Sequence, residues 1–108
     1  MRKFLALMTI SLAPAVACAE FYSGNQLYAQ MTNRDSFDRL AALAYVAGAA
    51  DAVTGVLSCP PAGVSVGQVY DLTKQLLEAM PESRHRSADS FVQAVMKANW
   101  PCRASRGT

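Results

Sequence analysis

The chain has 108 residues, of which 52% are hydrophobic and 17% charged, and its formal net charge is +2. This length has room for one domain, and the composition is typical of a packed globule rather than a disordered chain. The small net charge and the absence of a basic patch argue against nucleic-acid binding.

The first 19 residues predict a secretory signal peptide. Arg2 and Lys3 form a basic start, residues 4–16 form an apolar run, and residues 17–19 (Ala-Cys-Ala) have the pattern of a cleavage site. The run is too short to span a membrane. Cleavage after Ala19 leaves residues 20–108 as the mature domain, with eight basic and eight acidic residues.

Two other interpretations of this segment stay open. An ordinary amphipathic first helix fits less well, because the run is apolar on all sides. Ala15-Val16-Ala17-Cys18 resembles a lipobox, which would make Cys18 the site of a lipid anchor. Lipoboxes usually carry Leu where this chain has Ala15, so simple cleavage is the preferred interpretation.

The mature part predicts an all-α bundle of about four helices. Ser23 and Gln26 form a capping-box pattern, so a short first helix should begin near Gly24. Asp35 is the cap candidate for a long second helix, from about Ser36 to Leu57. The stripe predicted to be buried on this second helix consists of Phe37, Leu40, Ala41, Ala44 and Gly48.

The third and fourth helices follow a rigid turn and a polar connector. Ser65 should cap the third helix, from Val66 to about Met80, and Ser87 should cap the last one. The apolar stripe of the third helix is Val66, Val69, Tyr70, Thr73, Leu76, Leu77 and Met80. Its opposite, solvated face carries Gln68, Asp71, Lys74, Gln75 and Glu78. The apolar positions of the last helix are Ala88, Phe91, Val92, Val95 and Ala98.

Two cysteines remain in the mature chain, and an export pathway places them where disulfides form. Pairing Cys59 with Cys102 closes a loop of about 44 residues, which the chain-entropy model values at roughly 4 kcal/mol. A metal site would need more ligands than two cysteines and one histidine supply. We therefore predict one disulfide and no metal.

The residues do not assemble a recognisable active site, so we expect a protein that is not an enzyme and needs no cofactor. No Gly-x-Ser-x-Gly, His-Glu-x-x-His or Gly-rich phosphate loop is present in the sequence. Asp51 has two interpretations, a catalytic acid or a buried carboxylate bonded to its neighbours, and we prefer the second. His85, between Arg84 and Arg86, is either a partner contact or a solvent-facing side chain bonded to a nearby carbonyl.

Several segments taken together resemble the Rap/Tai family of type VI secretion immunity proteins. They are Gly24-Asn25-Gln26-Leu27, Tyr45-x-x-Gly48-x-x-Asp51-Ala52, Cys59-Pro60-Pro61-x-Gly63-Val64-Ser65, Pro81-Glu82-x-Arg84-His85-x-x-Ala88 and Trp100-Pro101-Cys102. They cover nearly the whole mature chain in order. The Cys-Pro turn, the Pro-Glu-x-Arg-His connector and the final Pro-Cys are together fairly specific.

The resemblance implies a periplasmic domain that binds and blocks a peptidoglycan-cleaving amidase toxin, with a homodimer as a possible assembly. The residues that it implies contact the partner are Gln68, Asp71, Lys74, Gln75, Glu78, Glu82, Arg84 and His85. The residues that it implies have structural roles are Tyr45, Gly48, Asp51, Pro60, Gly63, Pro81 and Pro101.

The chain departs from this family at one place. Members commonly carry a second cysteine pair that joins the first two helices, and the matching positions here are Met31 and Ala42. Packing of Met31 on the small Ala42 would replace that bridge. Two other functions stay open: a periplasmic acid-stress chaperone, and an envelope binding domain of the same fold with another partner.

Overall fold

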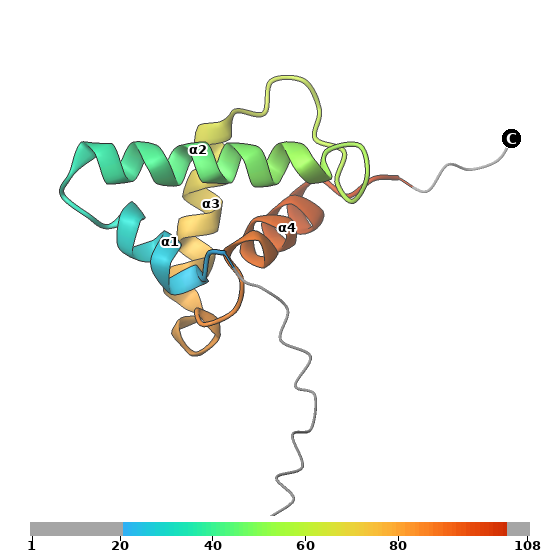
Figure 1. The fold of residues 1–108 in the computed structure, drawn as a ribbon. Helices are drawn as coiled ribbons and strands as arrows, with labels where there is room; N and C mark the ends of the chain where they lie inside the picture. The colour runs from blue at the N-terminus through green and yellow to red at the C-terminus, as the bar shows by residue number, and fades with distance from the viewer. Residues whose placement is uncertain (1–20, 104–108) are drawn as a thin grey trace, which may run out of the picture.

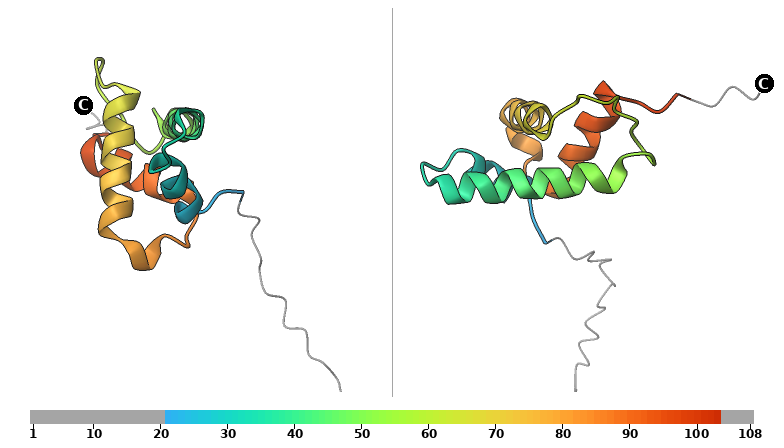
Figure 2. Two further views of the ribbon diagram at one scale, coloured as in Figure 1. Left: turned by 90° about the vertical axis from the view of Figure 1, so that its left-hand side faces the viewer. Right: turned by 90° about the horizontal axis from the view of Figure 1, so that it is seen from above.

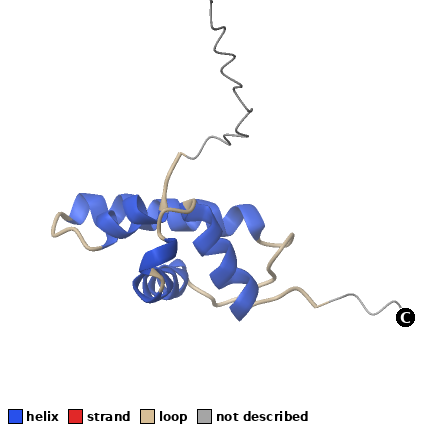
Figure 3. Cartoon of the chain, turned by 90° about the horizontal axis from the view of Figure 1, so that it is seen from below, coloured by secondary structure: helices blue, strands red, loops and turns tan. Residues whose placement is uncertain are grey.

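The computed structural model describes residues 21–103, so the predicted signal peptide and Cys18 lie outside the described residues. Four α-helices follow one another: α1 (Gly24–Met31), α2 (Ser36–Val53), α3 (Val66–Ala79) and α4 (Ala88–Asn99). A short 3-10 helix, η1 (Pro81–Ser83), precedes α4. Within the described range Figure 3 shows only helices and loops, which confirms the predicted all-α class.

Three of the helices begin with a side-chain cap, as predicted. Ser23 and Gln26 form a complete capping box at α1, and Ser65 and Gln68 form another at α3. At α2 the Asp35 side chain accepts a hydrogen bond from the amide of Phe37. These caps explain why the predicted starts of the three helices agree with the structure.

The start of α4 differs from the prediction. Ser87 occupies the cap position, but its side chain makes no capping hydrogen bond. The first amide of the helix, on Ala88, donates to the carbonyl of Tyr22 at 2.8 Å. Tyr22, two residues before α1, therefore satisfies one of the amides at the start of α4 that have no intrahelical acceptor.

Helix α2 ends at Val53, four residues before the predicted end at Leu57. Gly55 has a φ of +81°, a conformation that an L side chain rarely adopts, so the helix cannot continue through it. The chain then folds back, and the amides of Leu57 and Ser58 both donate to the carbonyl of Val53. This tight turn directs the chain toward the end of α4.

Helix α2 lies across the other three helices and contacts all of them (Figures 1 and 2). One hydrophobic core lies between the helices, and α1, α3 and α4 also contact one another. Its most deeply buried apolar side chains are Leu27, Met31, Ala42, Val46, Leu77, Ala88, Val92 and Met96. Met31 and Ala42, the positions of the missing cysteine pair, thus both lie in this core.

The predicted buried stripe of α2 is wrong. The residues that α2 buries are Ala42, Val46, Ala50 and Val53. Phe37 and Leu40, which were predicted to be buried, are 74% and 60% exposed. Apolar or small residues occupy almost every position of this helix, so its periodicity fits two opposite faces and does not identify the buried one.

The stripes of α3 and α4 agree better with the structure, because both helices have a clear polar face. Val69, Thr73 and Leu77 are buried on α3, whereas Val66 at its first turn is 39% exposed. On α4, Met96 is buried and Ala98 is exposed, so the buried face is rotated slightly from the prediction.

Candidate partner-binding surfaces

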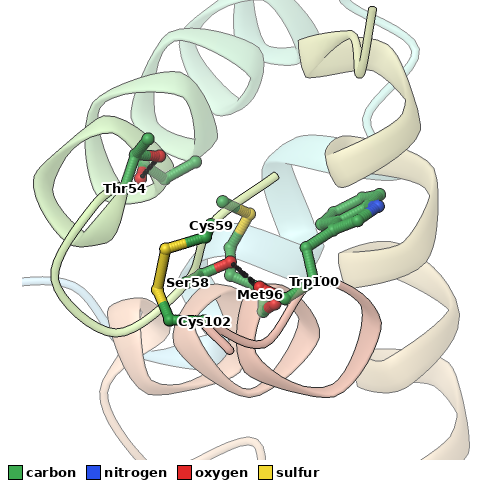
Figure 4. Close-up of a disulfide and its surroundings, with 7 residues drawn as sticks. Thr54, Ser58, Cys59, Met96, Trp100 and Cys102 are labelled. Carbon is green, nitrogen blue, oxygen red and sulfur yellow. Dashed lines mark hydrogen bonds between the residues drawn. A yellow bond between two sulfur atoms is a disulfide. The ribbon is translucent and has the colours of Figure 1, made fainter. Parts of the chain in front are cut away.

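The disulfide joins the turn after α2 to the end of α4, as predicted. The sulfur atoms of Cys59 and Cys102 are bonded at 2.00 Å, and the two Cα atoms are 4.7 Å apart (Figure 4). The amide of Cys59 also donates to the carbonyl of Trp100 at 2.8 Å. The bridge therefore holds two segments that also pair through their backbones.

Ser58 completes this end of the molecule, and the sequence did not reveal it. Its side chain is fully buried, and its hydroxyl lies 2.9 Å from the carbonyl of Met96 and 2.8 Å from that of Trp100 (Figure 4). The Met96 carbonyl also accepts from the amide of Trp100, and the Trp100 carbonyl from the amide of Cys59, so the Ser58 hydroxyl is an additional donor at the end of α4. A serine next to a predicted disulfide cysteine was the only available signal.

The residues with predicted structural roles around the turn occupy fitting positions. Gly63 has a φ of +100°, which requires glycine. Pro60 is half-buried, and Pro101 forms an isolated antiparallel bridge with Ser58.

The connector between α3 and α4, residues 81–86, is hydrogen-bonded to the start of α1. The amide of Gly24 donates to the carbonyl of Arg86, and the amide of Asn25 donates to that of Arg84, both at 2.7 Å. Gly24 is buried in this contact: an added Cβ would lie 2.8 Å from the Arg84 carbonyl oxygen and from the Phe91 ring. The connector is thus part of the scaffold.

The side chains of the connector divide between scaffold and surface. Arg84 is half-buried, with its guanidinium carbon 4.5 Å from the centre of the Tyr28 ring, a cation–π contact. His85 is exposed and its Nδ1 lies 3.1 Å from the carbonyl oxygen of Glu82. Pro81 is the first residue of η1, a position where the backbone N–H that proline lacks would have no intrahelical acceptor. Glu82 is exposed.

The polar face of α3 is open to solvent, as predicted. Asp71, Gln75 and Glu78 are exposed, and Lys74 is half-buried. Gln68 is exposed too, but its Oε1 accepts from the amide of Ser65 at 2.8 Å and so serves the capping box. The side chain of Gln68, in the first turn of this face, is therefore engaged in capping its own helix.

The exposed face of α2 consists mainly of apolar and small side chains. It runs along the helix at positions 37, 40, 41, 44 and 48, which lie on one side at helical spacing, and it ends at the exposed Asp51. Phe37 and Leu40 supply its bulk, and Gly48 is open, with nothing within 4 Å of an added Cβ. Contiguous apolar surface of this kind on a small domain marks an interaction site.

The expected burial of Asp51 is wrong, because the structure places this residue on the surface. An added Cβ at Gly48 would meet nothing within 4 Å, so no described helix packs closely on this residue. Asp51 is exposed, neither a buried carboxylate nor one bonded to its neighbours. Ala50, next to it, is the residue that faces the core.

Tyr45 connects α2 to the start of α1. Its ring stacks on that of Tyr22, with ring centres 5.0 Å apart, and the Tyr22 hydroxyl is hydrogen-bonded to the side-chain amide of Gln30. Burial, and secondarily the charge of Asp89, raises the pKa of the Tyr45 hydroxyl above its usual value of 10.0. Tyr45 thus has a packing environment that fits the structural role predicted for it.

These features define a class of protein: a small, disulfide-bonded helical domain with surfaces suited to a protein partner. Among residues 21–103 no three His, Cys, Asp or Glu side chains gather as metal ligands, and no helix is long and apolar enough to cross a membrane. The family model of the Rap1a immunity proteins matches residues 23–102. The chain therefore belongs to the Rap1a immunity protein family, which indicates a function in toxin immunity. No curated protein matches this chain.

Proposed function

We propose that this chain is a periplasmic immunity protein that binds and inhibits a peptidoglycan amidase toxin delivered by type VI secretion. The match to the immunity family over residues 23–102 is the observation that supports it most. The signal peptide proposed for residues 1–19 would deliver the domain of residues 20–108 to the compartment of the toxin's substrate. Inhibition is stoichiometric and needs no catalytic group.

The toxin-binding surface in this proposal is the polar face of α3 with the connector beside it. Asp71, Glu78, Glu82 and His85 are exposed and available for contact. Arg84 is a weaker candidate than the sequence implied, because its side chain packs on Tyr28. Charged contacts of this kind favour rapid association and discrimination among related toxins.

The exposed face of α2 suits a second copy of the chain. If two α2 helices pair antiparallel about a two-fold axis at Ala44, Leu40 of one copy lies opposite Gly48 of the other. The bulky half of the face then meets the small half, and the contact is self-complementary, as a two-fold interface requires. Gly48 has room for such a side chain, since an added Cβ meets nothing within 4 Å.

Rescue of cells tests the toxin proposal. Co-expression of the chain should protect cells from a periplasm-directed amidase encoded beside it, and Asp71→Lys with Glu78→Lys should weaken protection. Lys97→Glu, an exposed charge reversal on α4, is the matched control and should protect fully. Absence of rescue for every neighbouring toxin candidate, with the protein folded and exported, would overturn the proposal.

Sedimentation tests the dimer separately. The purified protein should sediment as a dimer and Leu40→Glu as a monomer, because a charge on the apolar face must be desolvated in the pair. Val56→Glu introduces the same charge at a residue that is 73% exposed outside α2, and should leave the dimer intact. A monomeric wild-type protein at micromolar concentration would contradict the pairing.

A further inference from the structure

A pocket of about 200 Å³ opens where the second half of α2, the turn after Cys59 and the start of α3 meet. Its walls are mainly apolar, with Ala47 and Ala50 on α2 and Val66 and Val69 on α3. Pockets for cofactors and drug-sized ligands have volumes of about 300–1,000 Å³. The space here is smaller and fits a single large side chain.

The carboxylate of Asp51 is the one ionic group in the wall of this pocket. The other polar groups are committed to their own helices: the Thr54 hydroxyl donates to the carbonyl of Ala50, and the Ser65 hydroxyl accepts from the amide of Gln68. The lining holds no basic residue, and within residues 21–103 no hydrogen bond engages the Asp51 carboxylate.

Apolar walls together with one unpaired carboxylate favour one kind of side chain as the occupant of the pocket. A purely apolar side chain would fill the walls but would strip water from an unpaired carboxylate, which is unfavourable. A side chain with an aliphatic stem and a cationic head satisfies both parts, because the stem packs on the walls and the head pairs with the carboxylate.

We propose that this pocket is an anchor site for an arginine or lysine side chain of a protein partner. The proposal rests on the proposed function only in that the partner is a protein. It places a contact at the junction of α2 and α3, and gives the exposed Asp51 a role that the fold does not. Arginine is the stronger candidate, since its planar head binds a carboxylate through two hydrogen bonds.

Small probes test the site without a toxin. In a titration of the disulfide-bonded protein followed by amide chemical shifts, Nα-acetyl-arginine methylamide should perturb residues around the pocket. The citrulline analogue, which has the same shape without the charge, should bind about fivefold more weakly, in line with one exposed ion pair. The lysine analogue shows which cation is preferred.

Two variants sharpen the result. Asp51→Asn should bring the arginine affinity down to that of citrulline, whereas Asp89→Asn, an exposed carboxylate outside the pocket, should leave it unchanged. Ala47→Leu should fill the pocket and abolish binding of both probes. Equal binding of arginine and citrulline, or no localised shift for any cationic probe, would overturn the anchor site. Such a failure leaves the rescue assay unaffected, so the two proposals fail independently.

Discussion

The two ends of this bundle are held by different kinds of bond. At one end, the Cys59–Cys102 disulfide and the buried hydroxyl of Ser58 join the turn after α2 to the end of α4. At the other end, backbone carbonyls of the connector receive the first amides of α1, and Gly24 is enclosed by them. The first end depends on particular side chains, whereas the second depends on groups that every residue carries. The sequence therefore predicts the disulfide at the first end but gives no sign of the backbone hydrogen bonds at the second.

The largest effect should come from removing the covalent bond. Cys59→Ser combined with Cys102→Ser should lower the free energy of unfolding by about 4 kcal/mol, because the unfolded chain regains the freedom of a long loop. Urea denaturation measures this loss, and chemical reduction of the wild-type protein is the control that should match it. Partner binding should survive, since neither cysteine is proposed to contact a partner. A loss below about 1 kcal/mol would show that the disulfide end is held mainly by packing.

The opposite end should be broken by one methyl group. Gly24→Ala should destabilise the protein by about 1–3 kcal/mol, because the new Cβ would lie 2.8 Å from a backbone oxygen that cannot easily move. Gly67→Ala is the matched control in the first turn of α3, where the Cβ would meet Ser65 Oγ at an ordinary 3.7 Å. Thermal unfolding should find the control unchanged or slightly more stable. Equal stability of the two variants would contradict the prediction, because it would mean that the atoms around Gly24 can move to accept a Cβ at no cost in free energy.

A smaller loss is expected from Ser58→Ala, about 1–2 kcal/mol. The variant removes a fully buried hydroxyl that hydrogen-bonds at the end of α4, although the carbonyls of Met96 and Trp100 each keep one backbone amide donor. Ser90→Ala removes an exposed hydroxyl bonded to the carbonyl of Ser87 and should change stability by no more than about 0.5 kcal/mol. If both variants unfold at the same denaturant concentration, the disulfide alone holds this end.

The smallest effect concerns pH at the α1 end. The folded state favours the neutral form of Tyr45, so its pKa lies above the unfolded value of 10.0. The resulting stabilisation is fully present below pH 10 and is lost as the pH rises through the folded pKa. The difference between tyrosinate absorbance titrations of the wild-type protein and Tyr45→Phe should give a midpoint above that of free tyrosine. A midpoint at or below that value would mean that Tyr45 is not shielded by Tyr22 and α4.

Much of the fold could be predicted because its signals are local. Ser23 with Gln26, and Ser65 with Gln68, mark two helix starts through side chains three residues apart. The two cysteines that follow the predicted signal peptide admit one intramolecular pairing, and the structure confirms that pairing. The stripe of α3 stands out against a polar opposite face.

Other features could not be predicted, because they depend on contacts distant in sequence. In α2 the two apolar faces differ only in what packs on them, so its buried face was assigned incorrectly. The tight packing around Gly24 depends on backbone carbonyls of the connector. Every residue carries such a carbonyl, so the sequence does not indicate the contact. Asp51 was expected to be buried because its neighbours are small and apolar, but the helix turns it outward.

The pairing of α1 with the connector also bears on the order of folding. At eight residues, α1 is shorter than the roughly 12–15 residues that an isolated helix needs for marginal stability in water. The acceptors of its first amides lie just before α4, near the end of the domain. We therefore expect the first helix to be the last to become stable, because its closure requires contacts across most of the chain. A chain emerging N-terminus first would keep this segment unfolded until α4 is available.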